Sequence, residues 1–333
     1  MKSYLENMAV SSRVRLARNL AHLPYPPFDD LTEPVMSFMA QATSVLRKSG
    51  RYKAYAMSAL TPLQKQSLIE KHQISPLLAA NKSSGAVLIS ADERVSVMLN
   101  EEDHLRLQCV TKGFDLVSAF CVLNEIDDRL IASLPIAYDG ELGFLTACPT
   151  NVGTGMRASV MMFLPALTQT EGIQKIVREL GKAKIEVRGI FGEGTKASAY
   201  LYQISNKLSL GYSEFNLLNA VMRAALTLAE AEAKAREQVI DDYSGVKDKS
   251  LRAFGLINYC YKLKMSELYD CYASIKLGEY YDFFSISNME KFDEMLSLCG
   301  KANLLVSGKA ELGEEVLRAR QAKKIITQVC KLL

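Results

Sequence analysis

Four stretches of the chain alternate hydrophobic and polar positions, the pattern of a β-strand with one buried and one exposed face. In "SSRVRL" (residues 11–16), Arg13 and Arg15 fall on one face and Val14 and Leu16 on the other. The other three runs are "VSVMLNEEDHLRLQCV" (95–110), "MRASVMMFLP" (156–165) and "KAKIEVRGIFGEG" (182–194). We expect a strand in each run.

The alternation also indicates which polar side chains share a face. It groups Glu102, His104 and Arg106 in the second run, and Arg157 and Ser159 in the third. Between the runs lie helical stretches at 114–130 and 168–181. Strands with one polar and one apolar face predict an antiparallel sheet, with helices packed on its apolar side and a site on its polar side.

The remainder of the chain has a helical pattern. Residues 213–239 are rich in Ala, Glu, Leu and Lys, and the polar segment 241–250 ("DDYSGVKDKS") predicts a linker. Two later helical stripes consist of Leu268, Cys271, Tyr272 and Ile275, and of Phe292, Met295, Leu296 and Cys299. Ser287 with Glu290 has the spacing of a capping box for the second stripe, and Gly300 suits its end.

The predicted fold class is therefore α+β. We expect an antiparallel sheet flanked by helices over residues 1–240 and a small all-helical C-terminal domain over 241–333. The segment "FLTACPTNVGTGMRASVMMFLPAL" (144–167) has glycines spaced as in a phosphate-binding loop, but it lacks the Lys-Ser/Thr pair of such a loop. Alternation from Arg157 onward favours a strand there.

Composition excludes little. The chain has 333 residues, of which 49% are hydrophobic and 23% charged, as in ordinary globular proteins. The net charge of +3 gives no argument for nucleic acid. We expect no membrane span and no signal peptide, because no apolar run is long enough. Seven cysteines without a CxxC pair indicate reduced thiols in a cytoplasmic protein.

Histidine placement gives no support for a metal centre. His22, His72 and His104 are far apart in the sequence, so we expect no His-rich metal site. A Ser-His-Asp triad stays open, although no local motif indicates one.

Arginines dominate the polar positions of the predicted strands. They are Arg13, Arg15, Arg106, Arg157 and Arg188. Five guanidinium groups facing one concavity would repel one another unless an anion lay between them. A nucleotide triphosphate with Mg²⁺ fits, because guanidinium groups bind phosphate oxygens bidentately and phosphoryl transfer needs positioning and charge neutralisation.

Two glutamates indicate the acceptor. Glu102 and Glu193 belong to the same runs, and a carboxylate pair can grip a planar cation such as a guanidinium group. One carboxylate can take the proton as the nitrogen attacks. Cys148 could add a thiolate whose pKa neighbouring cations lower. These residues point to an enzyme that phosphorylates a guanidino nitrogen.

Five blocks between residues 11 and 207 carry a family resemblance. They are "SSRVRLARN", "NEEDHLR", "CPTNVGTGMRAS", "RGIFGEG" and "QISNK". Together they resemble the ATP:guanido phosphotransferases, the phosphagen kinase family. The resemblance implies an eight-stranded antiparallel sheet and a kinase that uses ATP and Mg²⁺.

The resemblance also implies residue roles. The five arginines match the family's nucleotide-phosphate arginines, Ser159 and Gln203 fall where the family contacts adenosine, and Glu102 and Glu193 match its substrate carboxylates. Glu102 is the expected base, and Cys148 matches a substrate-side cysteine. Arg18 could equally make a structural salt bridge or contact phosphate. For His104 we expect a structural role, and Gly192 and Gly194 could be turn residues or part of a closing loop.

Chain layout points to one branch of the family. Members that act on free arginine or creatine carry a helical domain before the first arginine motif, whereas here twelve residues precede Arg13 and the extra helices follow the sheet region. This layout resembles the bacterial branch that phosphorylates arginine side chains of proteins, as do "RAFGLI" (252–257) and "IKLGEYYDF" (275–283) more weakly. That branch implies a stress-response role, with clients marked for a Clp unfoldase–protease, a zinc-binding adaptor and a homodimer.

One C-terminal stretch departs from this branch. Where it has Arg-Asp-x-x-Arg-Ala, thought to bind phosphoarginine, this chain has Glu314, Glu315 and Arg318 in "EEVLRA". Replacing a cation by an anion predicts weak or absent binding of phosphoarginine there. Two alternative functions stay open: a kinase for a free guanidino compound, and a catalytically silent regulator that binds nucleotide or phosphoarginine.

Overall fold

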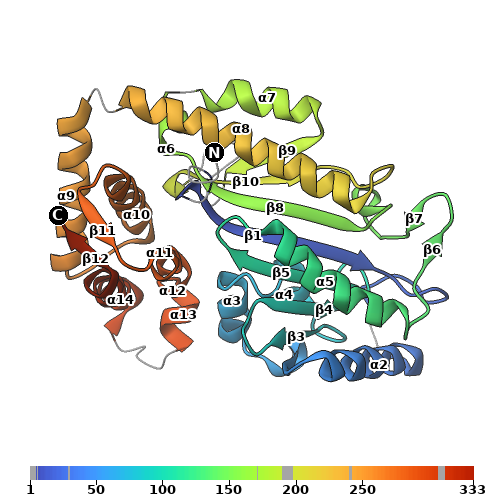
Figure 1. The fold of residues 1–333 in the computed structure, drawn as a ribbon. Coiled ribbons are helices and arrows are strands. Elements are labelled where there is room, and N and C mark those ends of the chain that lie inside the picture. The colour runs from blue at the N-terminus through green and yellow to red at the C-terminus, as the bar shows by residue number, and fades with distance from the viewer. Residues whose placement is uncertain are drawn as a thin grey trace.

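The computed structural model describes residues 5, 7–28, 31–170, 172–189, 198–239, 242–306 and 312–333. Its centre is an eight-stranded sheet with the order β2-β3-β4-β5-β1-β8-β10-β9, in which every neighbouring pair is antiparallel (Figure 1). The strands are β1 (Ala9–Arg18), β2 (Tyr52–Ala56), β3 (Ala86–Ser90), β4 (Val95–Leu99), β5 (Leu105–Lys112), β8 (Met156–Phe163), β9 (Ile185–Gly189) and β10 (Leu201–Asn206). The predicted α+β class with a large antiparallel sheet is confirmed.

Helices cover the apolar face of this sheet. They are α2 (Glu33–Ser49), α5 (Leu116–Ile131), α6 (Pro165–Gln169), α7 (Ile173–Lys182) and α8 (Glu214–Val239). Val14, Ala158 and Ile204, from three adjacent strands, are fully buried beneath them. Because strand side chains alternate, the residues next to these three along each strand face the other side of the sheet.

The opposite face is covered at its β3–β4 side by α3 (Pro62–Glu70) and α4 (Pro76–Ala80). Leu78 of α4 packs there with Val87 and Met98 in a separate small core. The local 3-10 turns are η1 (Met57–Ala59), η2 (Pro149–Asn151) and η3 (Ser198–Tyr200), and the short hairpin strands are β6 (Tyr138–Asp139) and β7 (Gly143–Phe144). The sequence patterns had not predicted helices on this face.

C-terminal helices pack against one end of the sheet (Figure 1). They are α9 (Tyr243–Tyr259), α10 (Met265–Tyr280), α11 (Met289–Asp293), α12 (Met295–Leu298), α13 (Lys301–Val306) and α14 (Glu314–Val329), with a ribbon of β11 (Phe284–Ile286) and β12 (Cys330–Leu332). Their core includes Phe163 and Leu201, at the ends of β8 and β10. Phe163 lies six residues after Arg157 on β8, and Leu201 lies opposite Phe163 on β10, so both side chains point to the same sheet face as Arg157. The C-terminal helices therefore contact the face opposite the one that α5 and α8 cover.

The C-terminal part, predicted to be all-helical, also contains the β11–β12 ribbon. Four further local predictions are wrong. The run 95–110 is two strands joined by a turn at 100–104, and the linker predicted over 241–250 is mostly the start of α9. Asp242 caps that helix by accepting a hydrogen bond from Gly245 N at 3.2 Å. Asn288, and not Ser287, caps α11. The second C-terminal stripe is fully or nearly buried as expected, but it spans two short helices, α11 and α12.

Candidate functional site

Strand register brings four of the predicted arginines to one face of the sheet. Arg15 on β1 lies opposite Arg157 on β8, and Arg13 lies opposite Ser159. On the other side of β1, Arg15 lies opposite Gln108, two residues from Arg106 on β5. The predicted grouping of Arg13, Arg15, Arg106 and Arg157 is therefore observed.

Arg188 joins the same face from β9. It lies opposite Gln203 of β10, and the next pair along the two strands on this face is Glu186 with Ser205. Ser205 in turn lies opposite Ser159. The two positions expected near adenosine, Ser159 and Gln203, thus share the face of the arginines.

Three of these arginines form ion pairs with carboxylate side chains. Glu101 pairs with Arg106 at 2.5 Å, and Glu186 contacts both Arg157 and Arg188, the latter at 2.6 Å. Although burial opposes it, the charge of Arg106 and hydrogen bonds from Arg106 and Ser75 lower the pKa of Glu101. The sequence patterns had not indicated a role for Glu101 or Glu186. Glu186 could have been found, because alternation places it on the face of Arg188.

Arg13 and Arg15 differ from the others. Among the described residues, no carboxylate forms an ion pair with either side chain. Burial and the charges of Arg106 and Arg157 lower the pKa of Arg13 to about 10. Burial and the charges of Arg13, Arg106 and Arg157 lower the pKa of Arg15 well below its usual value. The centre of this face is thus a site of uncompensated positive charge that suits an anion.

Glu102 occupies the turn between β4 and β5, next to Glu101. Its backbone N–H donates to Glu101 Oε2 at 3.0 Å. Burial, followed by the negative charges of Asp103 and Glu101, raises the pKa of the Glu102 carboxyl, while Arg106 opposes the shift. A raised carboxyl pKa suits a group that accepts a proton during a reaction.

Asp103 ties this turn to the loop that carries Cys148. Its Oδ1 accepts hydrogen bonds from Asn19 Nδ2 at 2.6 Å and from Ala147 N at 2.7 Å. Glu102 directly precedes Asp103, and Cys148 directly follows Ala147. The hydrogen bond between Asp103 and Ala147 therefore brings the backbone at Glu102 close to the backbone at Cys148. Cys148 is half-buried, and its Sγ lies 3.1 Å from Thr150 Oγ1. The structure brings these two predicted residues to one end of the sheet.

The structure assigns roles to Arg18 and His104 but does not describe Glu193. Arg18 is buried, pairs with Asp127 at 2.6 Å and lies over the Phe144 ring at 3.5 Å, so its role is structural. His104 is fully buried, with Nδ1 2.8 Å from Asn19 Oδ1, which is a structural role and separates it from the exposed face predicted for it. Glu193, with Gly192 and Gly194, lies outside the described residues.

The wall formed by α3 and α4 also reaches the site. Ser75, between the two helices, donates a short hydrogen bond to Glu101, and the His72 carbonyl accepts one from Gln108 Nε2 at 2.7 Å. Sequence patterns could not reveal these contacts, because they join segments about thirty residues apart. The bond from Ser75 helps to fix Glu101, the carboxylate that holds Arg106, and the bond from Gln108 attaches the segment after α3 to β5.

An antiparallel sheet with an arginine-lined face, flanked by a carboxylate with a raised pKa, defines a phosphoryl-transfer class of site. A model of the ATP:guanido phosphotransferase C-terminal catalytic domain matches residues 34–235. The chain belongs to this family and is an ATP-dependent phosphotransferase.

Relatives with similar sequences indicate a branch of the family. The chain is 37% identical to the protein-arginine kinase of Caldanaerobacter subterraneus subsp. tengcongensis over 99% of both chains. It is 35% identical to that of Clostridium tetani over 96% of this chain and 94% of the relative. The resemblance to the bacterial protein-arginine kinases is thereby confirmed.

Solved structures of related kinases share the fold. Lombricine kinase superimposes with a TM-score of 0.60 at 28% identity, covering 71% of this chain and 70% of the other. The substrate-free duplicated taurocyamine kinase of Schistosoma mansoni gives 0.59 at 28% identity over 69% of this chain, which spans only 34% of that longer chain.

The described residues show no features of a metal site or of a membrane span. They contain no group of three or more His, Cys, Asp or Glu side chains placed to hold a metal ion. No helix in the described part of the chain is long and apolar enough to cross a membrane.

Proposed function

We propose that this protein transfers the γ-phosphate of ATP to the guanidino group of arginine side chains in proteins. The observation that carries the proposal is the pair Arg13 and Arg15, two cations without a carboxylate partner in the described structure. They share a sheet face with Arg106, whose charge in turn acts on Glu102, the carboxyl group with a raised pKa. The 37% identity to a protein-arginine kinase over nearly the whole chain supports a protein substrate.

Each residue would contribute a distinct part. Arg13 and Arg15 would bind the phosphate oxygens directly, while Arg106, Arg157 and Arg188 would complete the cage, already oriented by Glu101 and Glu186. Ser159 and Gln203 share this sheet face and would lie near the nucleoside. Prior orientation matters because phosphoryl transfer depends on positioning and charge stabilisation.

Glu102 would act on the acceptor. Its carboxylate accepts a guanidino N–H proton as the nitrogen forms a bond to the γ-phosphorus and the bond from that phosphorus to the ADP oxygen breaks. Cys148, held beside it through the Asp103–Ala147 hydrogen bond, would line the acceptor side. We propose Glu193, outside the described residues, as a second anchor for the acceptor.

Mg²⁺ would bind mainly through nucleotide oxygens and water. The described residues offer no cluster of carboxylates for it, and Mg²⁺ commonly keeps several waters when substrate phosphates hold it. When bound, it neutralises charge on the phosphates. The arginine face fits the nucleotide, because at its centre Arg13 and Arg15 supply positive charge that has no acidic partner in the described part of the chain.

The test is the substitution Glu102→Ala, with Glu102→Gln beside it. Loss of the base should lower the transfer rate about 10²–10⁴-fold, while ATP binding, measured by calorimetry, stays nearly unchanged. The product should be acid-labile phosphate on arginine, detected by mass spectrometry under conditions that preserve N-phosphates. Transfer at an undiminished rate in both variants would exclude this role for Glu102.

The same assay separates the two alternative functions. A kinase for a free guanidino compound would use free arginine better than an unfolded basic protein. A silent regulator would give no phosphoarginine with either acceptor. For the Glu102 variants, the matched control is Glu93→Gln, because it also removes one carboxylate but at an exposed position.

We further propose a division at residue 240, with a catalytic domain over 1–240 and a helical domain over 241–333. The family match ends at residue 235, close to this boundary. Exposed apolar side chains on the helical part support a homodimer contact there; they are Leu256, Tyr259, Tyr261 and Leu332.

For the cellular role we propose a cytoplasmic stress-response kinase. Its phosphoarginine would mark proteins for a Clp unfoldase–protease, with activity controlled by a zinc-binding adaptor. The resemblance to the bacterial protein-arginine kinases supports this role. Co-purification of the tagged protein from heat-stressed cells tests it: recovery of neither an unfoldase nor a zinc protein would contradict it.

A further inference from the structure

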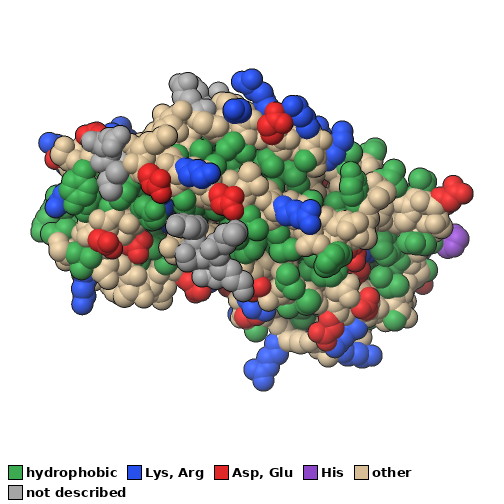
Figure 2. Space-filling model, turned by 45° about the horizontal axis from the view of Figure 1, so that its top comes forward, with side chains coloured by type: hydrophobic (Ala, Val, Ile, Leu, Met, Phe, Trp, Pro, Cys, Tyr) green, Lys and Arg blue, Asp and Glu red, His purple; other side chains and the backbone are tan. Residues whose placement is uncertain are grey.

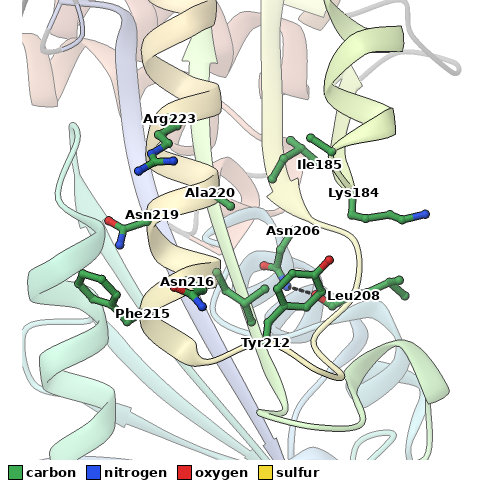
Figure 3. A pocket seen from close by; sticks show the side chains of 12 residues that line it. Lys184, Ile185, Asn206, Leu208, Tyr212, Phe215, Asn216, Asn219, Ala220 and Arg223 are labelled. Atoms are coloured by element: carbon green, nitrogen blue, oxygen red, sulfur yellow. Dashed lines mark hydrogen bonds between the residues drawn. The ribbon is translucent and has the colours of Figure 1, made fainter.

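A pocket lies on the helix-covered side of the sheet, opposite the arginine face. It has a volume of about 390 Å³ and is bounded by the start of β9, the end of β10, the segment after β10 and the first half of α8 (Figure 3). This is the sheet end that also carries the Glu102 turn and the Cys148 loop, because β5 and β8 begin there. The catalytic proposal above does not use it.

The pocket combines positive charge with aromatic surface. Lys184 and Arg223 lie on opposite sides of it in Figure 3, and among the described residues neither forms an ion pair with a carboxylate. Among the residues that the structure describes, no Asp or Glu lines the pocket. Tyr212 and Phe215 are 44% and 71% exposed, which is high for aromatic side chains beside a cavity.

Further apolar side chains extend this surface toward the β6–β7 hairpin. Leu210 is 47% exposed and Tyr138 is 63% exposed. Hydrophobic side chains gather on the right-hand half of the face seen in Figure 2, the half that carries this hairpin and the start of α8. An apolar surface with unpaired cations at its edges complements a chain segment that carries both apolar and acidic side chains.

The segment that forms the pocket is joined to the Cys148 loop. Ser209 Oγ donates hydrogen bonds to the carbonyls of Val152, at 2.9 Å, and Thr150, at 3.3 Å. Gly153 packs so closely that a Cβ there would lie 2.8 Å from Leu210 Cα. A polypeptide seated in the pocket would therefore need to cross only this loop to bring an arginine to the site.

We propose that this pocket binds a second segment of the protein substrate, one with an acidic side chain next to an aromatic or aliphatic one, while the arginine of the same chain is phosphorylated. The inference rests on the proposed function. The pocket would select substrates at a site separate from the catalytic residues. It would recognise side chains that lie several residues away from the arginine that is phosphorylated.

Binding without ATP tests the pocket independently of catalysis. The probe is a fluorescein-labelled peptide with one arginine and an Asp-Phe-Asp segment. Three versions separate the segment from the arginine by about 4, 8 or 12 residues. Because an extended residue spans about 3.3–3.6 Å, these spacings cover a range of distances between the pocket and the catalytic site. Fluorescence anisotropy is compared with a peptide in which Lys-Ser-Lys replaces that segment. At one spacing, we expect tighter binding of the acidic peptide and a loss of this difference at high salt.

The variant is Lys184→Glu with Arg223→Glu, both exposed positions. It should weaken binding of the acidic peptide by about tenfold or more, and it should not weaken binding of the Lys-Ser-Lys peptide, whose positive charges suit the reversed pocket. Phe215→Ser should weaken it without changing the salt dependence. Lys234→Glu with Lys331→Glu changes the net charge equally, outside the pocket, and should leave binding as in the wild type. Thermal unfolding checks that all variants fold.

Kinetics with the same peptides complete the test. The pocket variant should raise KM for the acidic peptide alone and leave kcat unchanged. Equal binding of both peptides by the wild type, or equal losses in the pocket and control variants, would overturn the pocket assignment. Selective peptide binding without any phosphoarginine would overturn the proposed function and leave the pocket. A change of sedimentation coefficient only in the pocket variant, without a peptide effect, would assign the pocket to a second copy of the chain.

Discussion

Arg15 and Arg157 lie directly opposite each other on the adjacent strands β1 and β8. Like charges in this position are normally destabilising. Glu186 compensates Arg157, whereas Arg15 has no ion-pair partner in the described part of the chain. The fold thus retains a repulsion that an anionic ligand would relieve.

Removing that repulsion should stabilise the ligand-free protein. We expect Arg15→Met to raise the free energy of unfolding by about 1 kcal/mol in urea, because a charge with a strongly lowered pKa is lost. The same variant should lose the rise in melting temperature that ATP produces in the wild type. Arg94→Met, at an exposed arginine, is the control. A destabilised Arg15→Met that still responds to ATP would contradict this account of Arg15.

Glu101 should set the pH at which Glu102 works. Its negative charge is one cause of the raised pKa of Glu102, and it also neutralises Arg106, whose charge opposes that shift. Glu101→Gln should therefore lower the pKa of Glu102 and move the acid limb of the kcat/KM profile to lower pH. Asp92→Asn, in the β3–β4 turn, should leave the limb in place. An unchanged limb in both variants would show that Glu102 is not the group titrated.

His104 should make the fold sensitive to acid. Burial lowers its pKa to about 4, against 6.5 for the unfolded chain. Between these values the unfolded chain binds more protons, so stability falls as pH drops from about 6.5 to about 4, by roughly 2–3 kcal/mol. His104→Gln should flatten this part of the stability profile, measured by urea unfolding at each pH. A variant profile parallel to that of the wild type would be inconsistent with a buried neutral imidazole.

Glu70 should stabilise the contact between α3 and α13. Its carboxylate accepts hydrogen bonds from the backbone N–H groups of Ala302, at 3.0 Å, and Asn303, at 2.9 Å. Gly300 leaves room for it, because a Cβ there would lie 2.4 Å from Glu70 Oε2. Glu70→Ala should cost about 1–2 kcal/mol of unfolding free energy, as for loss of a helix cap. Glu93→Ala, an exposed control, should cost much less.

Phosphoarginine should not act through the C-terminal stretch. Arg318 is buried and donates hydrogen bonds to the carbonyls of Cys299 and Leu263, each at 3.0 Å. Glu314 lies 3.9 Å from it and also pairs with Lys301. We expect no change in activity or melting temperature on titration with phosphoarginine. Activation at micromolar concentration that Arg318→Ala abolishes would show this expectation to be wrong.

The sequence predicted the arginine face well because strand alternation is a local property. Arg13, Arg15 and Arg157 follow from it directly, and the same rule extends to Glu186. It failed at residues 100–104, where a turn interrupts the alternation and turns His104 inward. The linker prediction failed because a helix whose outer face is polar has the composition of a loop, and its cap, Asp242, was not recognised.

Other parts of the site depend on contacts that no local pattern contains. Ser75 reaches Glu101 across 26 residues, and Asp103 reaches Ala147 across 44. Such pairs are set by how the sheet places distant turns at one edge. They could be assigned only after the strand order was known.

The helix α3 has a consequence for motion in this molecule. Its C-terminal end is fastened to α13 through Glu70, and the chain that continues from it reaches the carboxylate beside Arg106 through Ser75. A rotation of the C-terminal helices must therefore either break the first attachment or pull on the second. The segment between Glu70 and Ser75 thus connects α13 to Glu101, the carboxylate that holds Arg106, so a displacement of α13 would be transmitted to the arginine face by this path.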